Sequence, residues 1–462
     1  MATSGPDETS PPGPATSAPT ATSVVSPGLD EPAAARRSPA LAWLWSIAVA
    51  VVAWGVSMPK ELGLPIGVLL APGIVVTIAA ALIDRRALRA RGHPSAPWAV
   101  LAFLVFCGLS VAWSVDPQDT IMMTALYAGI AALAALLVWW TDARTFLRGL
   151  VLALVAVAGT TLWAVAMDRP KAIVTTLEVG AAYTGLYGNR NVLAYTVVLL
   201  LPALLAYRFR LRYVALGVKV ACVAGVVVLM YLSRSSTGKV AVAVLLAAAV
   251  VVWALRFVRP RVRLVLAGSA LGLAVVAATV GLLNRASLAA ALNKDATFSG
   301  RTLLWKKIIA VTEDRPFGGY GWGTVWNYHW YGQDGSAAYN RITRRLEKSY
   351  AHGHNGVFDV LPQVGVVGTA LMLAIVAVAF VGTLRALVSV PSGSTTTAPA
   401  EGTVFATLAL TAVVVLVVTE PVLTIPLGWF VLVALATFTS RTGRDRREQH
   451  PGSGWLRRRL DR

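Results

Sequence analysis

Cysteine, histidine and charged side chains are scarce in this sequence of 462 residues, which has two cysteines, five histidines and 14% charged residues. Cys107 and Cys222 each lie inside an apolar run, so we interpret both as small buried hydrophobic residues. They exclude a disulfide framework and a metal-binding cysteine pair. The alternating pattern of membrane barrel strands is also absent.

Long apolar runs dominate what is present, since 56% of the residues are hydrophobic. Runs near twenty residues are long enough to cross a bilayer as helices. We therefore predict an all-α, polytopic helical membrane protein with about twelve transmembrane helices. The predicted spans cover residues 40–58, 66–83, 97–113, 121–140, 147–167, 191–207, 213–232, 240–256, 264–283, 356–384, 403–418 and 424–440.

The distribution of Lys and Arg predicts the orientation in the membrane. If the N-terminus is cytoplasmic, the inner segments hold 25 of the 41 Lys and Arg residues, and the short outer loops hold six. The positive-inside rule counts short loops and excludes long ones, so both termini are predicted to be cytoplasmic. The basic excess is then mainly a topology signal, and it does not indicate nucleic-acid binding.

The predicted spans and their orientation divide the chain into five regions. Residues 1–39 are predicted to form a disordered cytoplasmic tail, because they are rich in Pro, Ser, Thr and Ala and show no apolar periodicity. Residues 40–283 carry nine spans, 356–440 carry three, and 441–462 form a basic cytoplasmic tail. Residues 284–355 form one long extracytoplasmic loop between spans nine and ten, with ten Lys and Arg against five acids. That balance suits an anionic ligand.

Arg234 and Lys239 lie in the short turn Ser233–Lys239 between two spans. One interpretation is a pair of cations that snorkel to the outer interface. The other is a functional site, because cations at an outer boundary run counter to the charge rule. The turn is not a phosphate loop, because Ser233 occupies the position of the first glycine that this motif requires and because no strand precedes the turn. Arg190, at the start of another span, has the same two interpretations.

A helix is predicted from Ser299 to about Thr312, with Leu304, Trp305, Ile308 and Ile309 on one apolar stripe. Arg301 lies near its N-terminus, where a cation opposes the helix dipole unless an anion is shared with the free backbone N–H groups. Arg301 is therefore a candidate anion-binding residue.

His352 and His354 have the spacing of metal ligands, but no carboxylate or thiolate is clearly placed beside them. We predict no metal site. His354 precedes a span directly and is followed by Asn355, so it places a proton-exchanging group at the outer boundary; the alternative is a structural histidine. The glycine-rich stretch Pro316–Gly323 can stack on a sugar ring or let the loop fold back closely on the bundle.

Taken together, these motifs resemble those of the O-antigen ligase and polymerase superfamily of bacterial envelope glycosyltransferases. Four matches occur in the order of that family, and they span most of the membrane part: Trp113-Ser114-Val115-Asp116-Pro117, Ser233-Arg234, Gly300-Arg301 through Trp305, and His354-Asn355 through Gly365 and Gly368. Arg190-Asn191 through Ala194 is a looser match. The chain departs from the family at Ser235-Ser236, where glycine and small residues are usual.

The resemblance implies a glycan donor on an undecaprenyl-diphosphate carrier and an acceptor hydroxyl on a glycan, lipid or protein, without cofactor, metal or nucleotide. Arg234 and Arg301 would neutralise the diphosphate leaving group, and His354 would take the acceptor proton or orient that hydroxyl. These roles agree with the chemistry, because guanidinium groups bind diphosphate oxygens and imidazole exchanges protons near neutral pH. Further substrate contacts are predicted from Arg190, Asn191, Lys239, Trp305 and Asn355.

Three alternatives stay open at this point. The first alternative is a polymerase, which differs from a ligase only in the acceptor; ligase is our first choice. About twelve spans with both ends inside is also a common layout of transporters and flippases. A noncatalytic protein that binds lipid-linked glycan is the third alternative. Membrane lipids are expected partners in every case, and the location is the cell membrane.

Overall fold

We analysed a computed structural model of the chain, which describes residues 37–57, 60–90, 97–176, 180–209, 212–258, 262–263, 301–326, 336–346, 350–388 and 400–449. The predicted ninth span at 264–283 and both terminal tails beyond these bounds lie outside the described residues. The principal helices are α1 (Pro39–Val56), α2 (Ile66–Ile83), α3 (Arg85–Ala90), α4 (Trp98–Leu109), α5 (Pro117–Trp140), α6 (Ala143–Ala166), α7 (Arg190–Ala206), α8 (Arg212–Leu232), α9 (Ser236–Ala254), α12 (Arg301–Thr312), α13 (Ala337–Thr343), α14 (Gly356–Val388), α15 (Glu401–Thr419) and α16 (Pro426–Gln449). Short 3-10 helices cover Lys60–Leu62, Ser110–Trp113, Gly185–Tyr187 and Leu255–Phe257.

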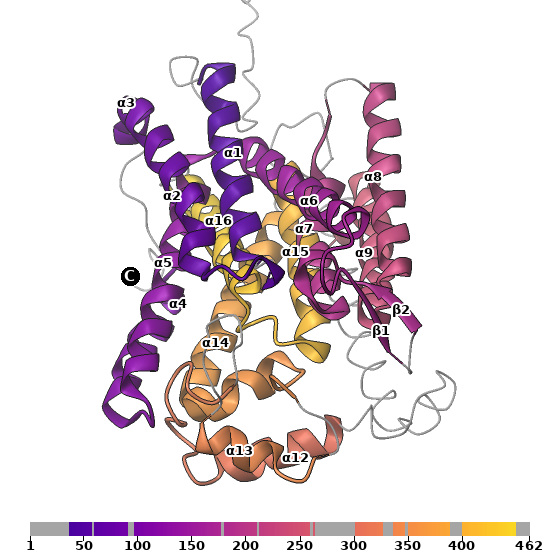
Figure 1. Cartoon of the computed structure of the whole chain (residues 1–462). Coiled ribbons are helices and arrows are strands. Elements are labelled where there is room, and N and C mark those ends of the chain that lie inside the picture. The colour runs from indigo at the N-terminus through magenta and orange to yellow at the C-terminus, as the bar shows by residue number, and fades with distance from the viewer. Residues whose placement is uncertain are drawn as a thin grey trace, which may run out of the picture.

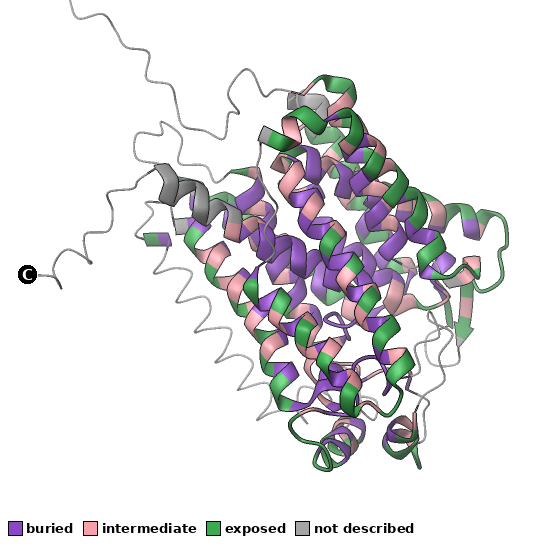
Figure 2. Ribbon diagram, turned by 90° about the vertical axis from the view of Figure 1, so that its left-hand side faces the viewer, coloured by how far each residue is buried: buried purple, intermediate pink, exposed green. Residues whose placement is uncertain are grey.

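The described helices fit a polytopic membrane protein. Seven are long and apolar enough to cross a membrane, and four more apolar helices of 10–17 residues occur within the described ranges. Peripheral helices expose apolar side chains, such as Val75 and Leu82 on α2 and Val250 on α9. Figure 2 shows buried residues along the inner faces and many exposed residues along the outside. Apolar side chains on the outside of long helices are the surface that lipid would cover.

Helices α7 and α16 form the centre of the bundle. Helix α7 packs against α6, α9 and α15, and α16 packs against α5, α14 and α15 (Figure 1). Nearly every side chain from Leu193 to Leu204 is buried, as is the stretch from Pro426 to Ala436. A helix that is apolar on all sides is expected at such a position. These two helices hold the ends of α9, α14 and α15, where the candidate site lies.

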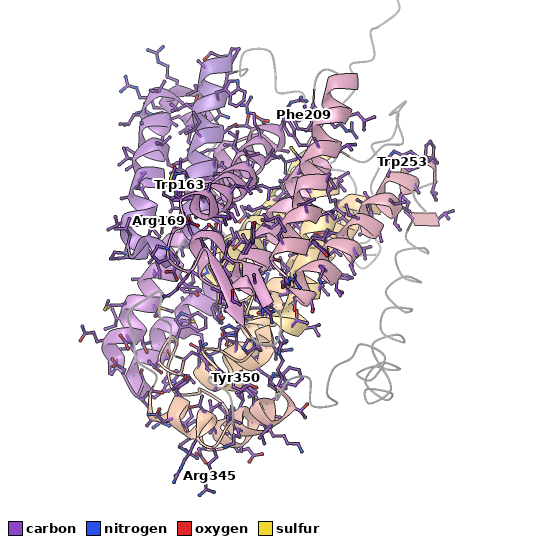
Figure 3. The ribbon with its side chains drawn as sticks, turned by 45° about the vertical axis from the view of Figure 1, so that its right-hand side comes forward. Trp163, Arg169, Phe209, Trp253, Arg345 and Tyr350 are labelled. Atoms are coloured by element: carbon purple, nitrogen blue, oxygen red, sulfur yellow. The ribbon has the colours of Figure 1, made fainter. Side chains whose placement is uncertain are left out.

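Segments that we predicted to be cytoplasmic meet at one end of the bundle. Arg37 forms a buried ion pair with Asp84, whose Oδ2 also accepts from the Trp45 indole at 3.0 Å. The Glu401 carboxylate lies 3.7 Å from the Arg144 guanidinium and accepts from the backbone N–H of Arg208 at 3.1 Å. Figure 3 shows Phe209 and Trp253 at the end opposite to Arg345 of the long loop. The side of the membrane that each end faces stays a prediction.

The opposite end carries the described part of the long loop and a small β-hairpin. Strands β1 (Ile173–Thr176) and β2 (Gly180–Tyr183) pair antiparallel, with Ile173 opposite Tyr183. The described chain is mostly helical, as predicted, whereas this hairpin was not predicted, because the pattern of two four-residue strands is too short to distinguish from loop. The hairpin leads through the 3-10 turn at Gly185–Tyr187 into α7.

The glycine-rich turn folds back on the bundle. The backbone of Gly319 has φ +63° and lies against the backbone of Gln363, and Gly365 has φ +61° and lies against the carbonyl group of Phe317. A Cβ atom at either glycine would overlap this backbone, and positive φ itself strains other residues. The Trp113 indole donates to the Gly318 carbonyl at 3.0 Å. Of the two interpretations of this turn, the structure shows close packing, which also kinks α14 at Gly365.

Candidate active site at the loop end of the bundle

Helix α12 is bound to the histidine segment that precedes α14. The Trp305 indole donates to the Gly353 carbonyl at 2.9 Å and stacks on Phe358, with ring centroids 5.2 Å apart. The predicted helix is confirmed from Arg301 to Thr312, whereas Ser299 lies outside the described residues. Its buried stripe differs from the predicted one, because Leu304, Ile308 and Val311 are buried while Ile309 is 43% exposed. Helix α12 packs on α13 and α14, which turns Ile309 outward.

Asn355 caps α14 and fastens it to α15. Its Oδ1 accepts from the backbone N–H groups of Val357 and Phe358 at 2.9 and 3.1 Å. Its Nδ2 donates to the carbonyl oxygen of Val418 at 3.1 Å. These contacts make Asn355 a positioning residue for the loop, and its predicted contact with substrate stays a prediction.

His354 is held in a strained backbone conformation between these anchors. Its φ is +49°, a left-handed value that costs a non-glycine residue about 1–3 kcal/mol. On its N-terminal side, Gly353 donates its N–H to buried Asp359 at 2.6 Å. Its own N–H donates to Nδ1 of His352 at 3.3 Å, and the two imidazole rings lie 4.1 Å apart. Strain that persists between fixed anchors is typical of functional sites.

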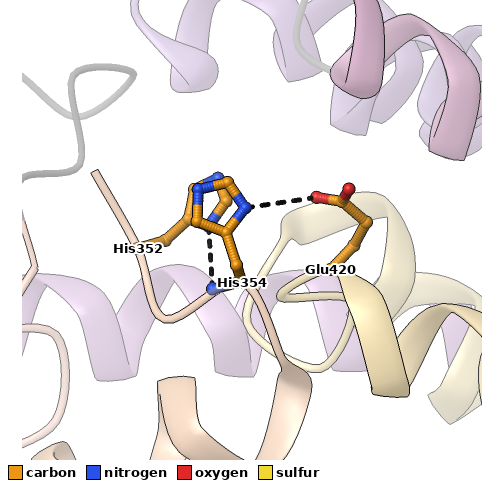
Figure 4. A group of neighbouring side chains, drawn as sticks. All are labelled: His352, His354 and Glu420. Carbon is orange, nitrogen blue, oxygen red and sulfur yellow. Dashed lines mark hydrogen bonds and ion pairs between the residues drawn. The ribbon is translucent and has the colours of Figure 1, made fainter. Parts of the chain in front are cut away.

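Glu420 is the residue that sequence reasoning missed. It follows the last residue of α15, and its side chain is 1% exposed. Its Oε2 lies 4.0 Å from Nδ1 of His354, and its Oε1 lies 4.0 Å from Nη2 of Arg301. Figure 4 shows the carboxylate facing the His354 ring, with His352 behind it. The available signal was an acid directly after an apolar run, in a chain with only 22 acidic residues.

Arg301 reaches the same point from the first turn of α12. Its Nη1 donates to the carbonyl oxygen of Thr419 at 3.0 Å, and its side chain is 20% exposed. Arg301 and His354 are 53 positions apart in sequence, and Glu420 lies 66 positions beyond His354. The structure thus brings together two of the three predicted catalytic residues around a carboxylate.

Burial sets the protonation states of this cluster. It raises the pKa of Glu420 to about 7, against the opposing effects of the Arg301 charge and the Thr237 hydroxyl. Burial and the Arg301 charge lower the pKa of His352 to about 4. Burial, His352 and Arg301 together hold the pKa of His354 far below its usual value. Both imidazoles are therefore neutral at pH 7, while the carboxylate is close to half-protonated.

Several buried polar atoms of the cluster lack hydrogen-bond partners. Among the described residues, His354 Nδ1 and both oxygens of Glu420 are buried and make no hydrogen bond of full geometry. Buried polar atoms are seldom left in this state, and such atoms at one spot suggest that a ligand or water completes them. The cluster has the properties of a receptor for a polar group.

The cluster also has the composition of a metal site. Donor atoms of His352, His354 and Glu420 lie within 4.8 Å of one another. The charged guanidinium of Arg301, 4.0 Å from the carboxylate, opposes a divalent cation at this point. The Nδ1 lone pair of His352 is already used by the His354 N–H. We therefore assign no metal here, and the absence of a metal from the mechanism stays a prediction.

The turn between α8 and α9 joins the cluster through Thr237, which acts on Glu420. Ser235 is buried and caps α9 by accepting from the Gly238 N–H at 3.2 Å. Its hydroxyl donates to Oδ1 of Asn191 at 3.0 Å, which ties this turn to the start of α7. The two segments that hold the looser motif and the Ser-Arg pair are therefore neighbours in space.

The predicted cations of these segments differ in their surroundings. Arg234 is exposed, with a left-handed φ of +54°, and Lys239 is exposed one turn later. Arg190 is half-buried, and its Nη1 is buried without a hydrogen-bond partner among the described residues. No ion pair of Arg190, Arg234 or Lys239 with an acid is found within the described ranges. These cations are available to an anion, and their role toward substrate stays a prediction.

Fold and site together define a polytopic helical membrane protein with a cluster of cations, imidazoles and one carboxylate at one end of the bundle. Residues 220–373 match the family model described as O-antigen ligase. The chain is also 24% identical, over 301 residues, to the exopolysaccharide production protein ExoQ of Rhizobium meliloti (strain 1021). These matches confirm the predicted resemblance to the O-antigen ligase and polymerase superfamily.

The two matches cover only part of each protein, and this limits the functional conclusions that they support. The match to ExoQ covers 63% of this chain and 66% of that protein, which is less than two thirds of its length. The family match contains Arg234, Arg301 and His354, whereas Glu420 lies beyond its end. The comparisons therefore support a glycan-processing membrane protein, and its reaction and substrate are matters for proposal.

Proposed function

We propose that this protein is a glycosyltransferase of the O-antigen ligase type, which moves a glycan from an undecaprenyl-diphosphate carrier to an acceptor hydroxyl at the outer face of the cell membrane. The carrying observation is that Arg301 and His354, from separate segments, meet within 4.0 Å of one buried carboxylate at the loop end of the bundle. The family match supports the same proposal, as do Arg190, Arg234 and Lys239, which have no acidic partner in the described part of the chain.

The guanidinium groups of Arg301 and Arg234 hold the diphosphate as the bond to the sugar breaks. Negative charge then grows on the leaving oxygens, and cations placed beside them stabilise it. Arg190, Lys239 and Asn191 line the approach of the same phosphate groups. The acceptor hydroxyl attacks beside His354, which takes its proton or orients it. Direct displacement inverts the anomeric centre.

In this proposal the cluster faces the extracytoplasmic side and both termini are cytoplasmic. Single cysteines test this orientation in a protein whose Cys107 and Cys222 are replaced by alanine. An impermeant maleimide applied to intact spheroplasts labels Glu313→Cys and leaves Arg86→Cys unlabelled. Both positions are exposed; Glu313 directly follows α12 and Arg86 lies on α3, and these helices are at opposite ends of the bundle (Figure 1). The reverse labelling pattern would refute the orientation.

Transfer is measured with purified protein in nanodiscs, a lipid-linked glycan donor and an acceptor glycolipid, with the product detected by mass spectrometry. We expect Arg301→Ala and His354→Ala each to lower the rate about 10²-fold or more. Arg89→Ala is the matched control, since Arg89 is an exposed cation on α3 at the other end. Full activity of both site variants ends the proposal. Glycan uptake into vesicles that survives His354→Ala would indicate a transporter instead.

A polymerase is the second candidate, because the relative ExoQ is named for exopolysaccharide production. In a polymerase the acceptor is another copy of the growing lipid-linked glycan. Deleting the gene and analysing extracytoplasmic glycans by mass spectrometry separates the two. Accumulation of unlinked polymer means ligase, and accumulation of single repeat units means polymerase.

A further inference from the structure

Glu420 has no part in the mechanism as described so far, yet it is the most buried charged group of the cluster. Its side chain is 1% exposed, against 19% for His354 and 20% for Arg301. An isolated carboxylate at such a position costs several kcal/mol unless it is paired or neutralised. Its nearest cation, at 4.0 Å, is too far for a hydrogen bond. Burial of this carboxylate therefore destabilises the folded state, which suggests that the residue has a chemical role.

The separation between Glu420 and His354 matches one bridging oxygen atom. Oε2 and Nδ1 are 4.0 Å apart, which is too long for a direct hydrogen bond. An oxygen at about 2.8 Å from each atom completes a triangle with ordinary hydrogen-bond lengths. Neither atom makes a hydrogen bond of ordinary geometry to a described residue, although the Thr237 hydroxyl also acts on the Glu420 carboxylate. A hydroxyl group matches the gap in size and in bonding.

The two groups differ in what they offer to a hydroxyl. A base must hold the proton that it receives, and the buried imidazole of His354, beside His352 and Arg301, does so poorly. Burial has the opposite effect on a carboxylate, so Glu420 gains affinity for a proton. A neutral imidazole still donates a hydrogen bond through Nδ1–H. The environment thus favours Glu420 as base and His354 as donor.

We propose that Glu420 accepts the proton of the acceptor hydroxyl and that His354 orients this hydroxyl for attack. The inference rests on the proposed function and decides between the two roles left open for His354. The acceptor oxygen forms a bond to the anomeric carbon, and the bond from that carbon to the diphosphate oxygen breaks. The hydroxyl proton moves to Oε2 of Glu420, and the electron pair of the broken bond leaves with the lipid diphosphate. Glu420 later releases the proton to water or to the departing diphosphate.

Arg301 links this step to donor binding. It lies at 4.0 Å from Oε1 of Glu420, and its Nη1 holds the carbonyl of Thr419. A diphosphate bound near Arg301 competes for its charge, so the carboxylate becomes a stronger base when the donor is in place. The other groups that face Glu420 are His352 and His354 from the loop, Thr237 from α9 and Tyr195 from α7. None of them is an acid that would replace Glu420 in this role.

The variant Glu420→Gln keeps the shape of the side chain and removes the base. We expect kcat to fall about 10²–10⁴-fold. We also expect the acidic limb of the pH profile of kcat to disappear, while the donor Kd, measured by tryptophan fluorescence, changes less than twofold. Glu401→Gln is the matched control, since Glu401 begins the same helix that Glu420 follows and pairs with Arg144 at the other end. It should keep the kcat and the pH profile of the parent protein.

Variants of His354 separate the two roles. The amide of His354→Asn donates a hydrogen bond but cannot take a proton, so we expect it to retain at least tenfold more activity than His354→Ala and to keep the acidic limb. If the acidic limb of the kcat pH profile is lost in His354→Asn but retained in Glu420→Gln, His354 is the base and the proposal is overturned. Retention of kcat within threefold in Glu420→Gln would overturn it as well.

A second readout covers the case in which a variant folds poorly. Glu420→Ala is first checked by size-exclusion chromatography and thermal unfolding, and is then assayed with added sodium formate. A rate that rises at least tenfold and saturates with formate supports a missing proton acceptor, and an unchanged rate in folded protein counts against it. Activity abolished by a chelator and restored by Zn²⁺ would make Glu420 a ligand and overturn the proposal. If only the role of Glu420 is wrong, Arg301→Ala and His354→Ala are still inactive. If the proposed transferase function is wrong, both variants keep full activity.

Discussion

Trp305 and Gly353, 48 residues apart, are joined by a hydrogen bond of 2.9 Å from the indole N–H to the backbone carbonyl oxygen. This bond connects the helix that carries Arg301 to Gly353, the residue before the strained His354. Arg301 lies one turn from Trp305 on α12, so the bond fixes the relative position of the guanidinium and the imidazole. The predicted glycine-arginine-tryptophan motif therefore contributes both the cation of the proposed site and the anchor that places it.

Removing that anchor should lower the rate of transfer. Trp305→Phe keeps the stacking on Phe358 but loses the hydrogen bond, which is worth about 0.5–1.5 kcal/mol. We expect a decrease of up to about tenfold in kcat, with little change in the amount of folded protein. Trp253→Phe, at an exposed position on α9, is the control. Equal kcat values in the two variants would show that the bond has no positioning role.

Docking of the glycine-rich turn depends on Gly365. Gly365→Ala would place a methyl group against the carbonyl of Phe317 and impose a side chain at φ +61°. We expect destabilisation of about 1–3 kcal/mol from the backbone conformation, and more from the overlap. Thermal unfolding in detergent measures this, with Gly159→Ala on α6 as control because no atom lies within 4 Å of its added Cβ. A Gly365→Ala protein as stable as the Gly159→Ala protein would contradict the packing described.

Ser235 should affect donor binding through the turn that it fixes. Ser235→Ala removes the cap of α9, worth about 1 kcal/mol, and the bond to Asn191. The turn that carries Arg234 is then held less firmly, and we expect the KM for the lipid-linked donor to rise severalfold. Ser38→Ala removes the cap of α1 at the other end of the bundle and serves as control. If the two substitutions raise KM equally, the turn does not position a donor-binding cation.

Stability should depend on pH through Glu420. Its pKa is raised from 4.5 to about 7, so the folded protein holds a proton that the unfolded chain releases between these values. Folding stability from this group is therefore greatest below about pH 4.5 and declines as the pH rises to about 7, by roughly 3 kcal/mol.

Glu420→Gln removes this decline. We expect the unfolding temperature of the variant, minus that of the parent protein, to increase from pH 5 to pH 8. The lowered pKa values of His352 and His354 destabilise both proteins on the acid side, so their effect largely cancels in this difference. A difference that is constant with pH would argue against a raised pKa at Glu420.

The long apolar helices could be predicted because their signals are local. Apolar length defined the helices in every predicted span that falls among the described residues, and the Lys and Arg distribution grouped Arg37, Arg144 and Arg208 at one end. The β-hairpin and α13 escaped prediction, since they are short and lie in connecting segments. The stripe of α12 was misassigned at Ile309, because the exposed side of a short helix depends on the partner that covers the other side.

The sequence by itself determined the helices, the motifs and the identities of two catalytic candidates, because bilayer-crossing length, charge and residue chemistry are properties of contiguous residues. Only the tertiary structure decided that Glu420 belongs with Arg301 and His354. An acid after an apolar helix is usually an ordinary interfacial residue. Here the packing of α15 against α7, α9 and α14 withdraws it from water and sets it between a guanidinium and an imidazole. Burial and proximity, which give the carboxylate its chemistry, do not exist until the chain has folded.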